Sequence, residues 1–143
     1  MVSSSHQVFI SHSSTDTWVA RQIANYICTC GASCFLDESN VQIGDDFEEK
    51  IREAANASDE LLVLLTPWAI DRPYVWLEMG AFWGPGKRIV GVLYGLTENQ
   101  LLAMEHVPML LKRSELISLN EIESYFNQLQ RRMQRSGVSD EKE

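Results

Sequence analysis

The sequence Leu-Leu-Val-Leu-Leu occupies residues 61–65 and contains no polar position. A strand with one wet face alternates apolar and polar residues, whereas a strand of a parallel sheet is covered on both faces and reads as an unbroken apolar run. Thr66 and Pro67 end the run, because proline lacks the N–H group that a sheet needs. The stretch therefore predicts a buried strand of a parallel sheet.

Four more short strands and the helices between them complete the expected fold. Apolar runs predict strands near residues 8–10, 34–36, 89–94 and 116–118. Apolar residues at helical spacing predict helices between these strands, and a last helix from about Asn120 through Met133. Alternating strands and helices indicate an α/β protein. We expect a flavodoxin-like three-layer fold, with a five-stranded parallel sheet in the order 2-1-3-4-5 and helices on both faces.

Length and charge limit the class of protein. The chain has 143 residues, which suits one domain with a full core. Its net charge of -8 argues against nucleic acid as a partner, since such proteins usually carry a basic stripe. No apolar run approaches the roughly 20 residues of a membrane span, and residues 1–7 do not resemble a secretion signal. We expect a cytoplasmic protein without a membrane partner, comprising a flexible N-terminus at 1–6, one domain at 7–134 and a flexible polar tail at 135–143.

The three cysteines do not indicate a metal site. Cys28, Cys30 and Cys34 are odd in number, and their spacing matches no common zinc pattern. Reduced thiols that pack as small buried apolar residues are the simplest interpretation. We therefore expect no metal.

One carboxylate stands in an apolar, aromatic stretch. Glu78 lies within residues 73–83, Pro-Tyr-Val-Trp-Leu-Glu-Met-Gly-Ala-Phe-Trp. In a helix, none of its neighbours three and four residues away can pair with a carboxylate; they are Tyr74, Val75, Ala81 and Phe82. A buried carboxylate without a partner either protonates or has a use, which makes Glu78 a candidate for chemistry. The alternative is a solvent-facing residue on a partly exposed helix.

Polar segments follow the strands that lie closest to the expected binding edge. In this fold, ligands bind beyond the carboxyl ends of the strands, near the switch between the first and third strands. Ser11 and Ser13 follow the first strand, where hydroxyl and amide groups could hold phosphate or ribose, or could only cap the next helix. Asp37 ends the second strand and could bind ribose hydroxyls, or could only stabilise its own turn.

Three segments together resemble the Toll/interleukin-receptor (TIR) domain family. Residues 8–16, Val-Phe-Ile-Ser-His-Ser-Ser-Thr-Asp, are similar to the family's first-strand motif. Residues 35–38 and 44–47 resemble its loop after the second strand, and residues 58–78 resemble its third strand and the following helix. The resemblance covers roughly residues 7–134.

The resemblance implies an activity and a set of site residues. Some TIR domains cleave NAD+ at the nicotinamide–ribose bond with one essential Glu on the helix after the third strand, and Glu78 matches it. Many of those enzymes have Trp four residues earlier, where this chain has Tyr74, with Trp76 two before. The substrate-binding residues are then expected to be Ser11, Ser13, Asp37, Ile43, Tyr74 and Trp76. NAD+ would be a substrate, and no cofactor is expected.

The resemblance also implies partners and rival functions. The family's enzymes commonly assemble through TIR–TIR contacts that include the loop matching residues 38–44, which suggests an oligomer in bacterial antiviral defence or effector signalling. The product, linear or cyclic, and the trigger stay open, as does the role of Glu78 as nucleophile, base or electrostatic stabiliser. The alternative is a non-catalytic TIR–TIR interaction module. A further rival, nucleoside deoxyribosyl transfer, would need a second acidic residue, for which Asp71 and Asp37 are candidates.

Overall fold

The computed structural model describes residues 6–36, 47–105 and 115–142, and these contain one parallel sheet in the order β2-β1-β3-β4-β5. β1 pairs with β2 on one side and with β3 on the other. The chain is therefore wound outward from β1 to β2, and then in the opposite direction from β3 to β5. The order 2-1-3-4-5 predicted from the sequence is confirmed. The strands are β1 (Gln7–Ser11), β2 (Ser33–Leu36), β3 (Glu60–Leu65), β4 (Arg88–Leu93) and β5 (Glu115–Ser118).

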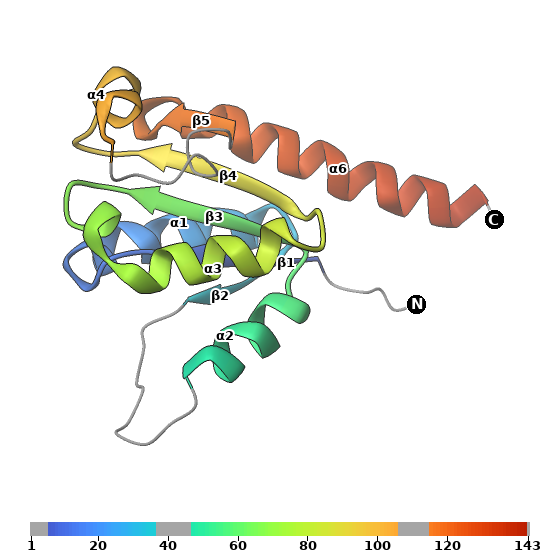
Figure 1. Ribbon diagram of the computed structural model, residues 1–143. Coiled ribbons are helices and arrows are strands. Elements are labelled where there is room, and N and C mark those ends of the chain that lie inside the picture. The colour runs from blue at the N-terminus through green and yellow to red at the C-terminus, as the bar shows by residue number, and fades with distance from the viewer. Residues whose placement is uncertain (1–5, 37–46, 106–114, 143) are drawn as a thin grey trace.

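Helices cover both faces of the sheet, as expected (Figure 1). α1 and α6 pack on one face, and α2, α3 and α4 lie on the other. The helices are α1 (Thr17–Thr29), α2 (Phe47–Asn56), α3 (Pro73–Trp83), α4 (Glu98–Ala103) and α6 (Ile122–Lys142). Short 3-10 turns precede three of them, at η1 (Ser14–Asp16), η2 (Ala69–Asp71) and η3 (Leu119–Glu121).

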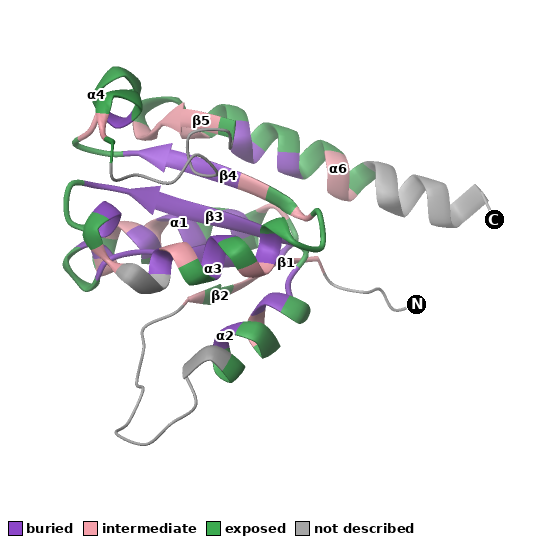
Figure 2. Ribbon diagram, in the orientation of Figure 1, coloured by how far each residue is buried: buried purple, intermediate pink, exposed green. Residues whose placement is uncertain are grey.

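Side-chain alternation along the strands divides the core into two layers. In β3, Leu62 and Leu64 pack toward α1 and α6, whereas Leu61, Val63 and Leu65 pack toward α3. All six residues of β3 are buried, which confirms that this strand is covered on both faces (Figure 2).

Two expectations about the edges of the core differ from the structure. The apolar spacing of the first helix includes Trp18 and Tyr26, and such spacing predicts burial. Both are exposed, at 72% and 61%, because the face of α1 that meets the sheet is formed by smaller residues, Ala20, Ile23, Ala24 and Ile27. Cys28 is exposed rather than buried.

The last helix is also longer than its apolar pattern. α6 continues to Lys142, although the apolar phase ends at Met133. The backbone hydrogen bonds of a helix form within the helix itself and do not need a buried face. The apolar spacing therefore placed the end of this helix too early. The segment expected as a polar tail from 135 is therefore helical as far as Lys142.

A buried carboxylate joins the start of β3 to α6. Glu60 is 1% exposed and accepts hydrogen bonds from Tyr125 Oη at 2.6 Å and from Arg132 Nη2 at 2.8 and 3.1 Å. His6 Nε2 lies 2.7 Å from Oε1 of the same carboxylate. Burial alone would raise the pKa of Glu60, but the bonds from His6 and Tyr125 and the charge of Arg132 outweigh it and hold the pKa below its usual range. This network anchors the amino end of the sheet.

We expect Glu60→Gln to lower the free energy of unfolding by roughly 3 kcal/mol near neutral pH, since it removes one partner of a buried ion pair. The folded-state pKa of Glu60 lies below its unfolded value of about 4.3, so this stabilisation is full above that pH and is lost as the pH falls through the folded-state pKa. Urea unfolding at neutral and acidic pH should therefore show the gap between wild type and variant narrowing in acid.

Glu115→Gln is the matched control for that measurement. Glu115 is 48% exposed and lies 3.6 Å from Arg88 Nη1 at its nearest oxygen, and an exposed pair of this kind contributes roughly 0.5 kcal/mol or less. Equal losses in the two variants, or a gap for Glu60→Gln that does not change with pH, would contradict the anchoring role.

Candidate functional site

The candidate site lies at the carboxyl ends of β1 and β3. Ser11 is the last residue of β1 and sits opposite Val63 of β3. β3 runs toward the side of the sheet on which α3 begins (Figure 1). These two strands border the switch point, where proteins with such sheets bind ligands.

Glu78 reaches this edge from α3 and is 0% exposed. Its Oε1 accepts a hydrogen bond from Ser11 Oγ at 2.5 Å. The contact joins two residues that are 67 positions apart, one on the sheet and one on the covering helix. The alternative of a solvent-facing Glu78 is therefore excluded.

The packing of α3 directs Glu78 inward. Pro73 occupies the first turn, where its missing N–H costs nothing. Val75, Met79 and Phe82 are buried against the sheet. Glu78 lies three residues after Val75 and four before Phe82, so it falls on the same buried stripe. The surrounding apolar side chains lower the local dielectric and strengthen the hydrogen bond to Ser11.

Ser13 serves as a cap in the described contacts. Its side chain is 0% exposed, and Oγ accepts a hydrogen bond from the Thr15 amide at 3.1 Å. The Ser13 carbonyl accepts from the Asp16 amide at 2.9 Å and lies 2.8 Å from Nδ1 of the buried His12. Of the two interpretations that the sequence left open for Ser13, the capping one accounts for these contacts.

A buried pair that the sequence did not indicate braces the same edge. Asp16 is 4% exposed, and its Oδ2 accepts a hydrogen bond from Thr66 Oγ1 at 2.7 Å. Thr66 Oγ1 in turn accepts from the Ala69 amide at 3.1 Å. The pair ties the loop after β1 to the segment that leads from β3 into α3. The sequence carries one signal for this pair: both residues follow strands of a parallel sheet, and the carboxyl ends of neighbouring parallel strands lie at the same edge.

The remaining predicted site residues lie elsewhere or outside the described part of the chain. Trp76 is two positions from Glu78, and residues at that spacing project about 200° apart on a helix. Trp76 therefore projects from another face of α3 than Glu78, and its part in substrate binding stays a prediction. Asp37, Ile43 and the side chain of Tyr74 lie outside the described residues.

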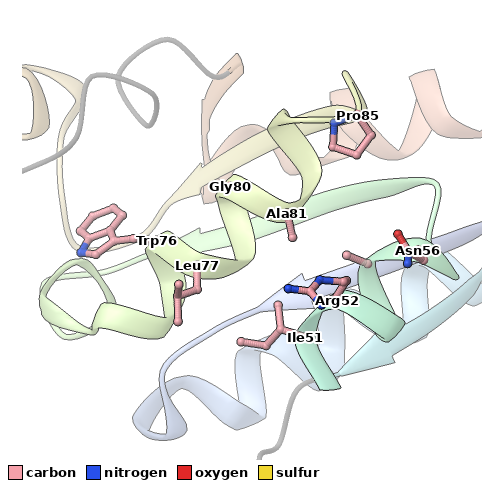
Figure 3. A pocket seen from close by; sticks show the side chains of 9 residues that line it. Ile51, Arg52, Asn56, Trp76, Leu77, Gly80, Ala81 and Pro85 are labelled. Carbon is pink, nitrogen blue, oxygen red and sulfur yellow. The ribbon is translucent and has the colours of Figure 1, made fainter. Parts of the chain in front are cut away.

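Trp76 instead borders a separate cavity of about 530 Å³ between α2 and α3 (Figure 3). Leu77 and Ala81 of α3 point toward Ile51 and Arg52 of α2 across it. The cavity is lined by Ile51, Arg52, Ala55, Asn56, Trp76, Leu77, Gly80, Ala81 and Pro85. Neither Ser11 nor Glu78 belongs to this lining.

The described residues offer no cluster of three His, Cys, Asp or Glu side chains that could hold a metal ion. Within the same residues, no helix is both long enough and apolar enough to cross a membrane.

Comparison with known proteins identifies the family. The sequence model of the TIR domain family matches residues 8–133 of this chain. The chain belongs to the TIR domain family. A curated relative from Brachypodium distachyon, named probable 2′ cyclic ADP-D-ribose synthase, is 27% identical over 124 residues, covering 85% of this chain and 54% of that protein. This TIR chain thus spans about half the length of that relative.

Solved structures share the fold of this chain at low identity. The metazoan TIR-STING receptor from C. gigas in complex with 2′,3′-cGAMP has a TM-score of 0.64 and 19% identity, covering 86% of this chain and 38% of that one. The CMP N-glycosidase BcmB of Clostridium botulinum has a TM-score of 0.55 and 17% identity, covering 86% of this chain and 97% of that one. At these identities the likeness concerns the fold alone.

Thr66→Val is expected to lower the free energy of unfolding by roughly 2 kcal/mol, because it keeps the shape of the side chain but leaves the buried Asp16 carboxylate without its hydroxyl donor. Urea unfolding measures the loss. Thr29→Val is the control: Thr29 is exposed and its Oγ1 donates to the Tyr26 carbonyl at 2.6 Å, so its removal should cost much less. Similar losses would show that the Asp16–Thr66 bond does not brace the site.

Proposed function

We propose that this TIR domain cleaves the nicotinamide–ribose bond of NAD+, with Glu78 as the catalytic carboxylate. The observation that carries the proposal is the carboxylate of Glu78, buried at the carboxyl edge of the sheet and oriented by Ser11 at 2.5 Å. Membership of the TIR family supports it. So does the relative whose name describes the synthesis of a cyclic ADP-ribose.

The chemistry of NAD+ suits a single carboxylate. Breaking the bond passes through a state with oxocarbenium character, as in glycoside hydrolysis. Nicotinamide is cationic while attached and leaves as a neutral molecule, so the leaving group needs no proton from an acid. Water, or in a cyclic product a hydroxyl of the same molecule, then bonds to the ribose carbon and releases its proton to solvent. Glu78 would face the ribose and stabilise the developing positive charge, in apolar surroundings that strengthen the effect. Ser11 acts as a positioning residue, since its hydroxyl donates to one carboxylate oxygen.

The burial of Glu78 sets a condition on this activity. Ser11 and Glu78 are both 0% exposed, so the substrate reaches the carboxylate only when the groups that cover it move. Assembly with further copies, the behaviour that the family resemblance implies, would supply the free energy for that movement. An isolated TIR domain would then be weakly active.

We expect Glu78→Gln to reduce NAD+ consumption roughly 100-fold or more, because it keeps the shape of the side chain but removes the charge that acts in the transition state. Ser11→Ala should reduce the rate by about tenfold through loss of one charge-assisted hydrogen bond. Nicotinamide release by concentrated protein measures both, and chromatography of the second product separates ADP-ribose from a cyclic form.

Glu98→Gln is the control, since Glu98 is an exposed residue of α4. CMP is the comparison substrate, because one protein of this fold is a CMP N-glycosidase. Equal NAD+ consumption by wild type and folded Glu78→Gln would refute the proposed role. Release of cytosine from CMP without release of nicotinamide from NAD+ would show that the protein cleaves a different N-glycosidic bond.

The burial of Glu78 also predicts that the rate of NAD+ cleavage depends on protein concentration. If assembly opens the site, the initial rate of nicotinamide release per mole of protein should rise as the protein concentration rises, and crowding agents should increase it further. A rate per mole that stays constant over the same range, while still depending on Glu78, would show that a single domain opens by itself.

A second function has a specific observation in its favour. A fully buried carboxylate that accepts a hydrogen bond from Ser11 would also serve as a structural link between β1 and α3 in a TIR domain that only binds other TIR domains. That function predicts no turnover at any concentration, self-association that persists, and a large loss of stability in Glu78→Gln. The nicotinamide assay and urea unfolding separate the two.

A further inference from the structure

Three arginines surround a second cavity, which lies away from Glu78. The cavity measures about 230 Å³ and is lined by Arg88, Gln128, Arg131 and Arg132. Arg88 is the first residue of β4, so the cavity lies at the amino edge of the sheet. The carboxyl edge, where Ser11 and Glu78 meet, is the opposite one. α6 runs lengthwise beside the sheet and extends past its amino edge (Figure 1).

Helix geometry brings the three α6 residues together. Gln128, Arg131 and Arg132 are spaced at i, i+3 and i+4, which places them on one face of the helix. Leu129, beside them in the sequence, is fully buried in the core. The polar face therefore borders the contact between α6 and the sheet, and Arg88 reaches it from β4.

Two of the guanidinium groups are held by acidic neighbours. Arg132 donates to Glu60 through Nη2 alone, and Arg88 Nη1 lies 3.6 Å from Glu115. Arg131 is exposed and makes no ion pair in the described part of the chain. Each guanidinium carries five N–H donors, so these contacts use only part of their donor capacity. The cavity thus has oriented donors, and the charge of Arg131 is not neutralised by an ion pair within the described residues.

The lining is unusual for this chain. The protein has 20 acidic residues against 12 basic ones, yet the described residues that line this cavity are three arginines and one glutamine. The larger cavity between α2 and α3 has a mostly apolar lining and suits a different class of ligand. Several guanidinium groups and one amide around a small space match an anion with many oxygen acceptors.

We propose that this cavity, which we call the Arg88–Arg132 site, binds a soluble molecule through a diphosphate or phosphate group. A guanidinium group pairs with phosphate oxygens through two parallel hydrogen bonds. A carboxylate has only two oxygens and would pair in this way with one arginine, whereas a diphosphate has enough oxygens to pair with several. The site's volume of about 230 Å³ is several times the roughly 30 Å³ that one water occupies, so a diphosphate group fits. A bound group would bridge β4 and α6.

Inorganic pyrophosphate is the probe, titrated by calorimetry into the full chain at constant ionic strength, with sodium chloride as the compensating salt. We expect saturable binding to one site and a rise of the melting temperature with ligand concentration, because the ligand binds only the folded state. Arg131→Ala and Arg88→Ala should each weaken binding roughly tenfold, the loss expected for one charge-assisted contact.

Arg52→Ala is the matched control. Arg52 is 62% exposed on α2 and pairs with Glu49 at 2.9 Å, and it lines the other cavity, so its variant should bind pyrophosphate like wild type. Ser11→Ala should also bind normally. The proposal is overturned if wild type shows no saturable binding, if Arg131→Ala and Arg88→Ala both bind like wild type, or if Ser11→Ala abolishes binding.

Discussion

The complete burial of β3 is the constraint on which the rest of the structure depends. All six of its residues are covered by helices on both faces of the sheet. A covered strand has no room for polar side chains along its length unless they are paired, so polar groups gather at its two ends. Glu60 occupies the amino end, and Thr66 follows the carboxyl end. Each is held by hydrogen bonds from other elements.

The two ends differ in what their polar groups do. At the amino end, Glu60 is surrounded by His6, Tyr125 and Arg132, and its charge is neutralised by a cation, which suits a structural anchor. At the carboxyl end, Glu78 is oriented by the hydroxyl of Ser11. Sheets of this strand order bind ligands at their carboxyl edge, and Glu78 lies there. Its position supports the placement of the proposed chemistry at that edge.

Much of the fold could be predicted from local patterns. The apolar run at 61–65 indicated a covered strand, and the alternation of strands with helices indicated the parallel sheet and its order. Patterns were less informative at element ends. The end of α6 was placed too early, and the exposure of Trp18 was not foreseen, because apolar character does not show which helix face meets the sheet.

The sequence by itself determined the layered α/β architecture, the resemblance to TIR domains and the candidacy of Glu78 as an isolated carboxylate in an aromatic stretch. Only the tertiary structure decided that Ser11 donates to Glu78, that Trp76 borders the cavity between α2 and α3, and that Glu60 is neutralised from α6. The physical reason is that apolar periodicity is local and reports which residues are buried. Hydrogen-bond partners are chosen by packing between elements that lie 67 or 72 positions apart in the chain.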